Sequence, residues 1–135
     1  VGEALLEPHR SYAKVVQIIR KIVDVKGMAH ITGGGITDNV PRIMPEGLGV
    51  EVQLGTWETA PLFRFLQECG HVDEYEMLRT FNMGIGYVLV VREHDLHRAT
   101  HAFNQSGEAA HVIGKVIRGE SRVNYTGSVR YAASN

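Results

Sequence analysis

The apolar run at residues 84–91, GIGYVLVV, constrains the fold of this 135-residue chain more than any other segment. It is far shorter than the roughly 20 residues that a membrane span needs. A short run that is rich in valine and begins at a glycine is typical of a strand. Because side chains on both of its faces are apolar, we expect it to be the central strand of a sheet.

Helical and strand-like patterns are interspersed along the rest of the chain. The predicted helices cover residues 11–23 with Ser11 as N-cap, 59–69 with Thr59 as N-cap, 73–80 with Asp73 as N-cap, and a segment from Leu96 that is closed by Gly107. The other predicted strands are residues 28–32 and 50–54 and a hairpin of 112–117 with 122–125, while the tail at 128–135 is expected to fray. This order predicts an α+β fold with helices packed on a mixed sheet.

Composition excludes several classes of protein. Hydrophobic residues make up 44% and charged residues 21%, which is typical of a globular domain and not of a disordered chain. The net charge of −1 lacks the basic excess of a nucleic-acid binder. One cysteine, Cys69, cannot form an internal disulfide, so we expect a cytoplasmic protein in which this side chain is a small buried hydrophobe. Residues 1–135 are expected to form a single domain, and the start at Val1 indicates a piece of a longer protein.

The strongest candidate for a binding site is residues 30–42, HITGGGITDNVPR. Three consecutive glycines, Gly33–Gly35, follow a predicted strand, and backbone amides at such a strand-to-helix junction can bind a phosphate or an oxyanion. Asn39 offers a donor and an acceptor, and Arg42 offers a bidentate guanidinium from the opposite side. The alternative is a tight turn that needs positive φ angles, with Asn39 and Arg42 simply solvated. The spacing matches neither the dinucleotide-binding fingerprint nor a P-loop.

A second candidate is residues 79–86, RTFNMGIG, at the start of the apolar strand. Thr80 and Asn82 are polar side chains where ligand-facing groups often lie, and Gly84 and Gly86 share one face of the strand, where another backbone or a ligand has room. Close packing of a helix against these glycines explains them equally well.

Three histidines, His94, His97 and His101, would share one face of a helix, with 97 and 101 at the spacing of a metal-binding pair. No H-E-x-x-H carboxylate accompanies them, so a solvated helix face is the favoured interpretation and no metal site is predicted.

The segments HITGGGITDNVPR at 30–42, RTFNMGIG at 79–86, LLEP at 5–8 and GEAAHVIGKV at 107–116 resemble the C-terminal half of phosphoribosylformylglycinamidine cyclo-ligases, also called AIR synthetases. The likeness extends over nearly the whole chain, except that His9 stands where the family has threonine and residues 94–105 match loosely. The resemblance implies an α/β/α layered domain that is partly ferredoxin-like. Other readings are a sibling ATP-dependent synthase or kinase, or a stand-alone module that binds a phosphorylated metabolite.

The family's reaction is the ATP-driven closure of the imidazole ring of formylglycinamidine ribonucleotide in purine biosynthesis. ATP phosphorylates the formyl oxygen, an amidine nitrogen attacks that carbon, and phosphate leaves. The resemblance implies that ATP and Mg²⁺ bind chiefly in an N-terminal half absent here, that the full-length enzyme is a homodimer, and that this fragment alone binds no cofactor and is inactive. The residues expected to bind the phosphoribosyl substrate are Thr32, Gly33, Gly34, Gly35, Asn39, Arg42, Thr80 and Asn82.

Overall fold

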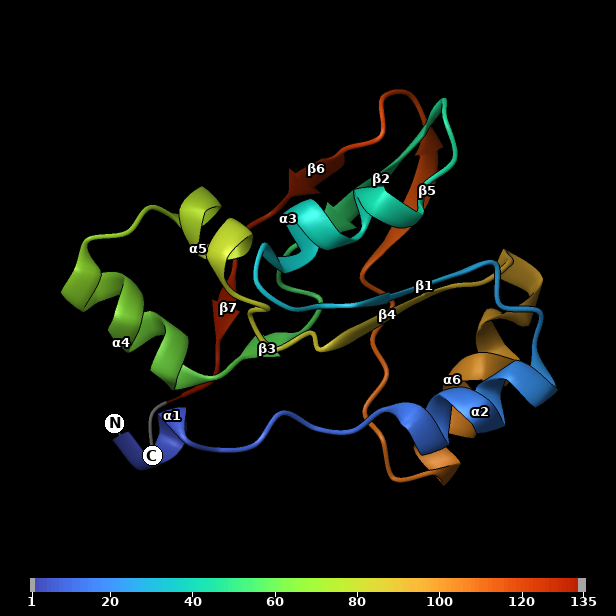
Figure 1. Ribbon diagram of the computed structural model, residues 1–135, viewed down its shortest axis with the longest axis horizontal. Helices are drawn as coiled ribbons and strands as arrows, with labels where there is room; N and C mark the ends of the chain where they lie inside the picture. The colour runs from blue at the N-terminus through green and yellow to red at the C-terminus, as the bar shows by residue number, and fades with distance from the viewer. Residues whose placement is uncertain (1, 134–135) are drawn as a thin grey trace.

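The computed structural model describes residues 2–133 and has the α+β fold that the sequence predicts (Figure 1). Its helices are α1 (Gly2–Leu5), α2 (Ala13–Ile22), α3 (Gly35–Asn39), α4 (Pro61–Gly70), α5 (Glu74–Thr80) and α6 (Leu96–Gln105), with 3-10 turns at Pro41–Ile43 and Glu93–Asp95. Its strands are β1 (Gly27–His30), β2 (Leu48–Gln53), β3 (Glu58–Thr59), β4 (Tyr87–Val90), β5 (Gly114–Arg118), β6 (Val123–Thr126) and β7 (Arg130–Tyr131). Within the described residues, no helix is long and apolar enough to cross a membrane.

The three-stranded sheet is mixed, in the order β5-β2-β6, and it corrects the predicted hairpin. β5 pairs antiparallel with β2 and β6 pairs parallel with it, so the two strands of the expected hairpin never touch each other. The connection crosses the end of β2, where a side chain on Gly49 would overlap the carbonyl oxygen of Glu120. The absence of a side chain at Gly49 therefore allows the connection from β5 to β6 to cross the end of β2. The turn-like sequence at 118–121 predicted a hairpin and gave no sign of this crossing.

The apolar strand β4 is not central within the described chain. It pairs only with β1, in an antiparallel ribbon that aligns Ala29 with Val88, and all four of its residues are only half-buried. The prediction of a central strand is wrong for residues 2–133, although the prediction of a strand is confirmed.

The β1–β4 ribbon lies between two separate clusters of apolar side chains. On one face, Ile31 and Val88 join a large cluster built with α3, α5 and β2, which includes the buried Trp57. On the other face, Leu89 packs with the helix pair α2 and α6 around Ile19. The ribbon and its helices therefore form layers, and the glycine loop lies at the end of β1 (Figure 1).

Capping differs from the prediction at two of three helices. Asp73 caps α5 as predicted, since its carboxylate accepts a hydrogen bond from the Glu76 amide at 3.0 Å. Thr59 lies in β3 instead and donates its hydroxyl to the Met83 carbonyl, and α2 begins after Tyr12 without a side-chain cap, not after Ser11. The tail contains β7, which pairs with β3 and is not frayed where it is described; residues 134–135 of the predicted tail lie outside the described residues.

Candidate functional site

The loop Thr32–Gly35 connects β1 to α3, and the fold demands glycine at two of its three glycine positions. Gly34 has φ 99° and Gly35 has φ 59°, both in the left-handed region that side chains rarely adopt. The Gly35 amide donates to the Thr32 carbonyl at 3.0 Å, which closes the turn. The tight-turn interpretation therefore accounts for Gly34 and Gly35.

Gly35 is also the point of closest approach between the loop and α5. A side chain there would overlap the Leu78 carbonyl oxygen and lie 2.6 Å from the Phe81 carbonyl oxygen. Because the backbones meet without an intervening side chain, the loop lies directly against the last turn of α5. The two sequence motifs at 30–42 and 79–86 are thus neighbours in space.

Gly33 differs from the other two glycines because nothing in the described structure requires it. Its φ is not in the left-handed region, and a methyl group built on it would meet no atom within 4 Å. The amides of Gly33 and Gly34 donate to no acceptor among residues 2–133. Gly33 thus combines open space around its Cα with an amide that has no partner in the described chain.

Asn39 holds the loop in shape from within. Its side chain is buried, and its amide nitrogen donates to the carbonyl oxygens of Gly35 at 2.8 Å and of Thr32 and Gly33 at 3.3 Å. Its donors, which the sequence assigned to a ligand, contact the loop's carbonyls instead. The Asn39 side chain therefore occupies these three carbonyls, whereas the amides of Gly33 and Gly34 have no acceptor among residues 2–133.

A charged pair that the residue patterns did not single out lies beside the loop. Asp38 approaches Gly34 closely enough that a side chain on the glycine would be 3.1 Å from the Asp38 carboxylate. The Arg79 guanidinium lies 3.8 Å from that carboxylate and is 55% exposed. Arg79 is the first residue of the RTFNMGIG motif. Its position next to Thr80 and Asn82 in the sequence could have identified it as a candidate site residue.

Arg42 lies at the other end of α3 from the glycine loop. It lines a surface groove with Thr37, Asp38, Tyr75 and Arg122, and none of the three glycines lines that groove. Thr37, which lines the groove, has its hydroxyl 2.7 Å from the hydroxyl of Tyr125, and burial raises the pKa of Tyr125 to about 12. The structure therefore brings Arg42 together with Arg122 along α3 rather than with the loop amides.

Thr80 and Asn82 lie at the end of α5 that meets the loop. Thr80 is exposed as the last residue of the helix, while the Asn82 carboxamide oxygen accepts a hydrogen bond from the Gly84 amide at 2.9 Å. A side chain on Gly86 would overlap the Tyr12 hydroxyl, so the room at this glycine is filled by α2's first turn.

The other sequence candidates lie away from the loop. His94, His97 and His101 are exposed, on the 3-10 turn and α6, and residues 2–133 contain no group of three or more histidine, cysteine or carboxylate side chains that could hold a metal. Cys69 is exposed near the end of α4, which corrects the expectation that it is buried.

The domain described so far is an α+β fold whose glycine loop lies between a strand and a short helix and against the end of a second helix. The family model described as AIR synthase related protein, C-terminal domain, matches residues 1–125. The chain therefore belongs to the AIR synthase related family, as the sequence motifs predicted.

The chain is also similar to curated enzymes of one name. A phosphoribosylformylglycinamidine cyclo-ligase of Bacillus cereus is 47% identical over 119 residues, which is 88% of this chain and 34% of the relative. The cyclo-ligases of Bacillus mycoides and Bacillus thuringiensis are 45% identical over the same shares. The chain thus spans about a third of the length of the curated relatives it matches.

Replacing Gly35 by alanine should destabilise the domain, whereas the same change at Gly33 should not. Gly35→Ala creates an overlap with the carbonyls of Leu78 in α5 and of Phe81 just after it, at a positive φ, and overpacking of this kind costs about 1–3 kcal/mol. Gly33→Ala meets no neighbour, so the free energy of unfolding should change by no more than about 0.5 kcal/mol. Urea denaturation of both variants measures the difference, and equal destabilisation would contradict this account of the loop.

The Tyr125 phenol should lose its proton at a higher pH than an exposed tyrosine, which makes the stability of the fold sensitive to strong base. Its pKa is raised to about 12 in the folded protein, against an ordinary value of 10.0, so the folded state holds the proton more tightly. This contribution to stability is complete below pH 10 and is lost as the pH rises toward 12. Absorbance titration of the phenolate, with Tyr125→Phe as the control, checks both the pKa and its assignment.

Proposed function

We propose that this chain is the C-terminal part of an ATP-dependent ligase that closes the imidazole ring of formylglycinamidine ribonucleotide. The observation that carries the proposal is the identity of 45–47% to curated cyclo-ligases over 88% of the chain. Because the chain corresponds to about a third of those enzymes, the activity belongs to a longer polypeptide of which residues 1–135 form one domain. On its own, the chain is expected not to turn over.

The substrate's phosphate binds at the outer side of the glycine loop in this proposal. Two amide donors, those of Gly33 and Gly34, are unpaired among the described residues, and Gly33 leaves room for close approach. Arg79 supplies a guanidinium beside them and offsets the charge of Asp38, which would otherwise repel an anion. Thr32, Gly35 and Asn39 then position the loop, and Thr80 and Asn82 border the same site.

Arg42 extends the proposed site along α3. Its groove carries two guanidinium groups, of Arg42 and Arg122, against the one carboxylate of Asp38, so it suits a second anionic or strongly polar part of the bound substrate. The distance along α3 separates this contact from the loop amides, so we assign Arg42 to the same substrate but to a different part of it.

The domain's contribution to the chemistry is positioning. Ring closure requires a nitrogen to reach a carbon in the same molecule, and holding both ends of that molecule converts the step into one with little entropic cost. Fixed amides and guanidinium groups also stabilise charge without reorganising. ATP with Mg²⁺ supplies the phosphoryl group that turns the formyl oxygen into a leaving group; we assign its site to the N-terminal domain of the longer enzyme. We also propose that the full-length enzyme is a homodimer and that it is located in the cytoplasm.

Substrate affinity should separate the loop's ligand-binding role from its structural role. Gly33→Ala should leave stability unchanged but weaken binding of the phosphoribosyl substrate, because the added methyl group occupies the approach to the amides. Arg79→Ala and Arg42→Ala each remove a charge-assisted contact of about 1.5–3 kcal/mol, or about tenfold or more in affinity. Isothermal titration calorimetry measures these dissociation constants.

The matched control is Arg130→Ala, since Arg130 is 57% exposed and ion-paired to Glu58 at 3.7 Å, much as Arg79 is paired to Asp38. The Arg130→Ala variant should bind the phosphoribosyl substrate with the same affinity as the unaltered chain. If the Gly33, Arg79 and Arg42 variants bind the substrate as tightly as the unaltered chain does, these residues do not belong to the site.

The reaction itself is tested in a chimera. This chain replaces the matched region of the Bacillus cereus relative, and the purified chimera is given formylglycinamidine ribonucleotide, ATP and Mg²⁺. We expect ATP-dependent formation of aminoimidazole ribonucleotide. A folded chimera that binds ATP but forms no product would contradict the proposed function.

A further inference from the structure

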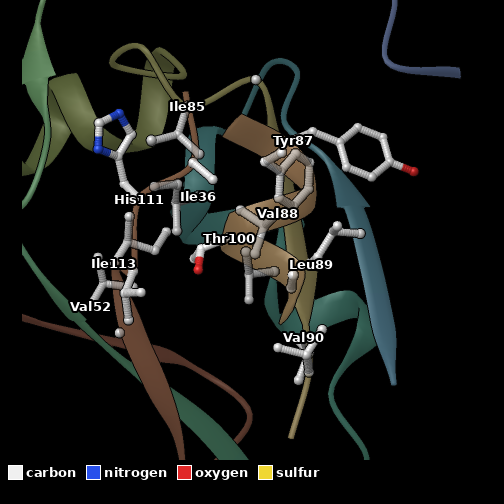
Figure 2. A pocket seen from close by; sticks show the side chains of 18 of the residues that line it. Ile36, Val52, Ile85, Tyr87, Val88, Leu89, Val90, Thr100, His111 and Ile113 are labelled. Atoms are coloured by element: carbon white, nitrogen blue, oxygen red, sulfur yellow. The ribbon is translucent and has the colours of Figure 1, made fainter. Parts of the chain in front are cut away.

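An apolar groove of about 390 Å³ runs between β4 and the β2–β5 pair (Figure 2). Its lining includes residues 87–90 of β4 and residues 114–116 of β5, but no residue of β1. Figure 2 shows Val52 and Ile113 on one side of the groove. Val88 and Val90 lie on the other side. The groove therefore lies along the side of β4 that faces away from its only partner strand.

Both strands that border the groove have an unpaired edge toward it. The Ile31 amide donates to the Gly86 carbonyl, so in the alternating antiparallel ladder the backbone groups of Tyr87 and Leu89 face away from β1. The Gln53 amide donates to the Ile113 carbonyl, so the backbone groups of Gly114 and Val116 face away from β2. Within residues 2–133, β4 and β5 each have a single neighbouring strand.

The groove leaves large apolar side chains exposed. Val112 and Val116, which line it, are 50% and 39% exposed. An apolar strand with an open edge is a pairing hazard that folded proteins normally cover. The sequence of β4 is that of a strand with neighbours on both sides, and the groove is where the second neighbour is missing.

We propose that one β-strand from outside these 135 residues fills the groove and hydrogen-bonds to β4 on one side and to β5 on the other. The occupant joins the β1–β4 ribbon to the β5-β2-β6 sheet, which makes β4 an interior strand. Its side chains alternate between the cluster around Val52 and the helix pair α2–α6, so both sets are apolar. A run of about four to six apolar residues without proline fits this site.

The occupant is an extended segment of the longer polypeptide and not a second copy of this chain. A folded copy can add its own sheet edge to one open edge, but it cannot pair with β4 and β5 at once from inside the groove. The matched cyclo-ligases, of which this chain spans 34%, contain the additional length that such a segment needs. The inference stands independently of the proposed ring closure, because it concerns strand pairing alone.

Hydrogen exchange tests the proposal amide by amide. The chain is measured alone and with synthetic peptides of about 12 residues that tile the part of the Bacillus cereus relative outside the match, long enough for one strand. One peptide should slow exchange at Tyr87 and Leu89 in β4 and at Gly114 and Val116 in β5 together, by about tenfold or more. The Ala29 amide, inside the β1–β4 ladder, reports whether the fold is intact or is restored by the peptide.

Two controls identify strand pairing as the cause. The same peptide with N-methyl groups at alternate residues keeps its side chains but cannot complete the ladder, so its protection should vanish. Val116→Asp should weaken peptide binding about tenfold, whereas Phe65→Asp, at an apolar side chain on α4 that is 46% exposed and outside the groove, should not.

Joint protection of both edges by one peptide supports the proposal. Failure of every peptide to protect them overturns it, as does protection of one edge only. Protection that appears without peptide and increases with protein concentration also overturns it, since that result identifies a second copy as the occupant.

Discussion

The candidate site depends on one backbone contact, the approach of Gly35 to the carbonyl end of α5. A glycine is required there because any side chain would overlap the Leu78 carbonyl oxygen. The contact brings together the motifs at 30–42 and 79–86, which are far apart in the sequence. It also fixes the direction of the loop, and the buried Asn39 side chain then holds three loop carbonyls inward. The amides of Gly33 and Gly34 take no part in this internal arrangement, since neither has an acceptor among residues 2–133.

The three consecutive glycines therefore have different physical reasons for being glycine. Gly34 needs a positive φ, Gly35 needs both a positive φ and the absence of a side chain, and Gly33 needs neither. A glycine loses more conformational entropy on folding than other residues do, and at Gly33 no feature of the described fold requires this loss. That asymmetry is the basis for placing a ligand beside Gly33, and it makes the two alanine variants informative about different properties of one loop.

The contrast between the sequence and the structure of β4 has a single explanation. Its residues are apolar on both faces and would be expected inside a sheet, yet they are half-buried beside an open groove. The predicted central position and the observed edge position are reconciled if a further strand belongs between β4 and β5. Side chains on the two faces of such a strand would contact the two apolar clusters that lie on either face of the β1–β4 ribbon.

The sequence by itself determined most of the helices and strands, the α+β class, the Asp73 cap and the family, because these follow from local periodicity and from motifs read along the chain. It also identified the glycine loop and the segment containing Thr80 and Asn82. It did not predict α1, β3 or β7. Only the tertiary structure decided which groups meet. It placed Arg79 rather than Arg42 beside the loop, turned Asn39 inward, and separated the expected hairpin by inserting β2. Pairing of strands and of charges depends on contacts between distant residues, which no local pattern of side chains specifies.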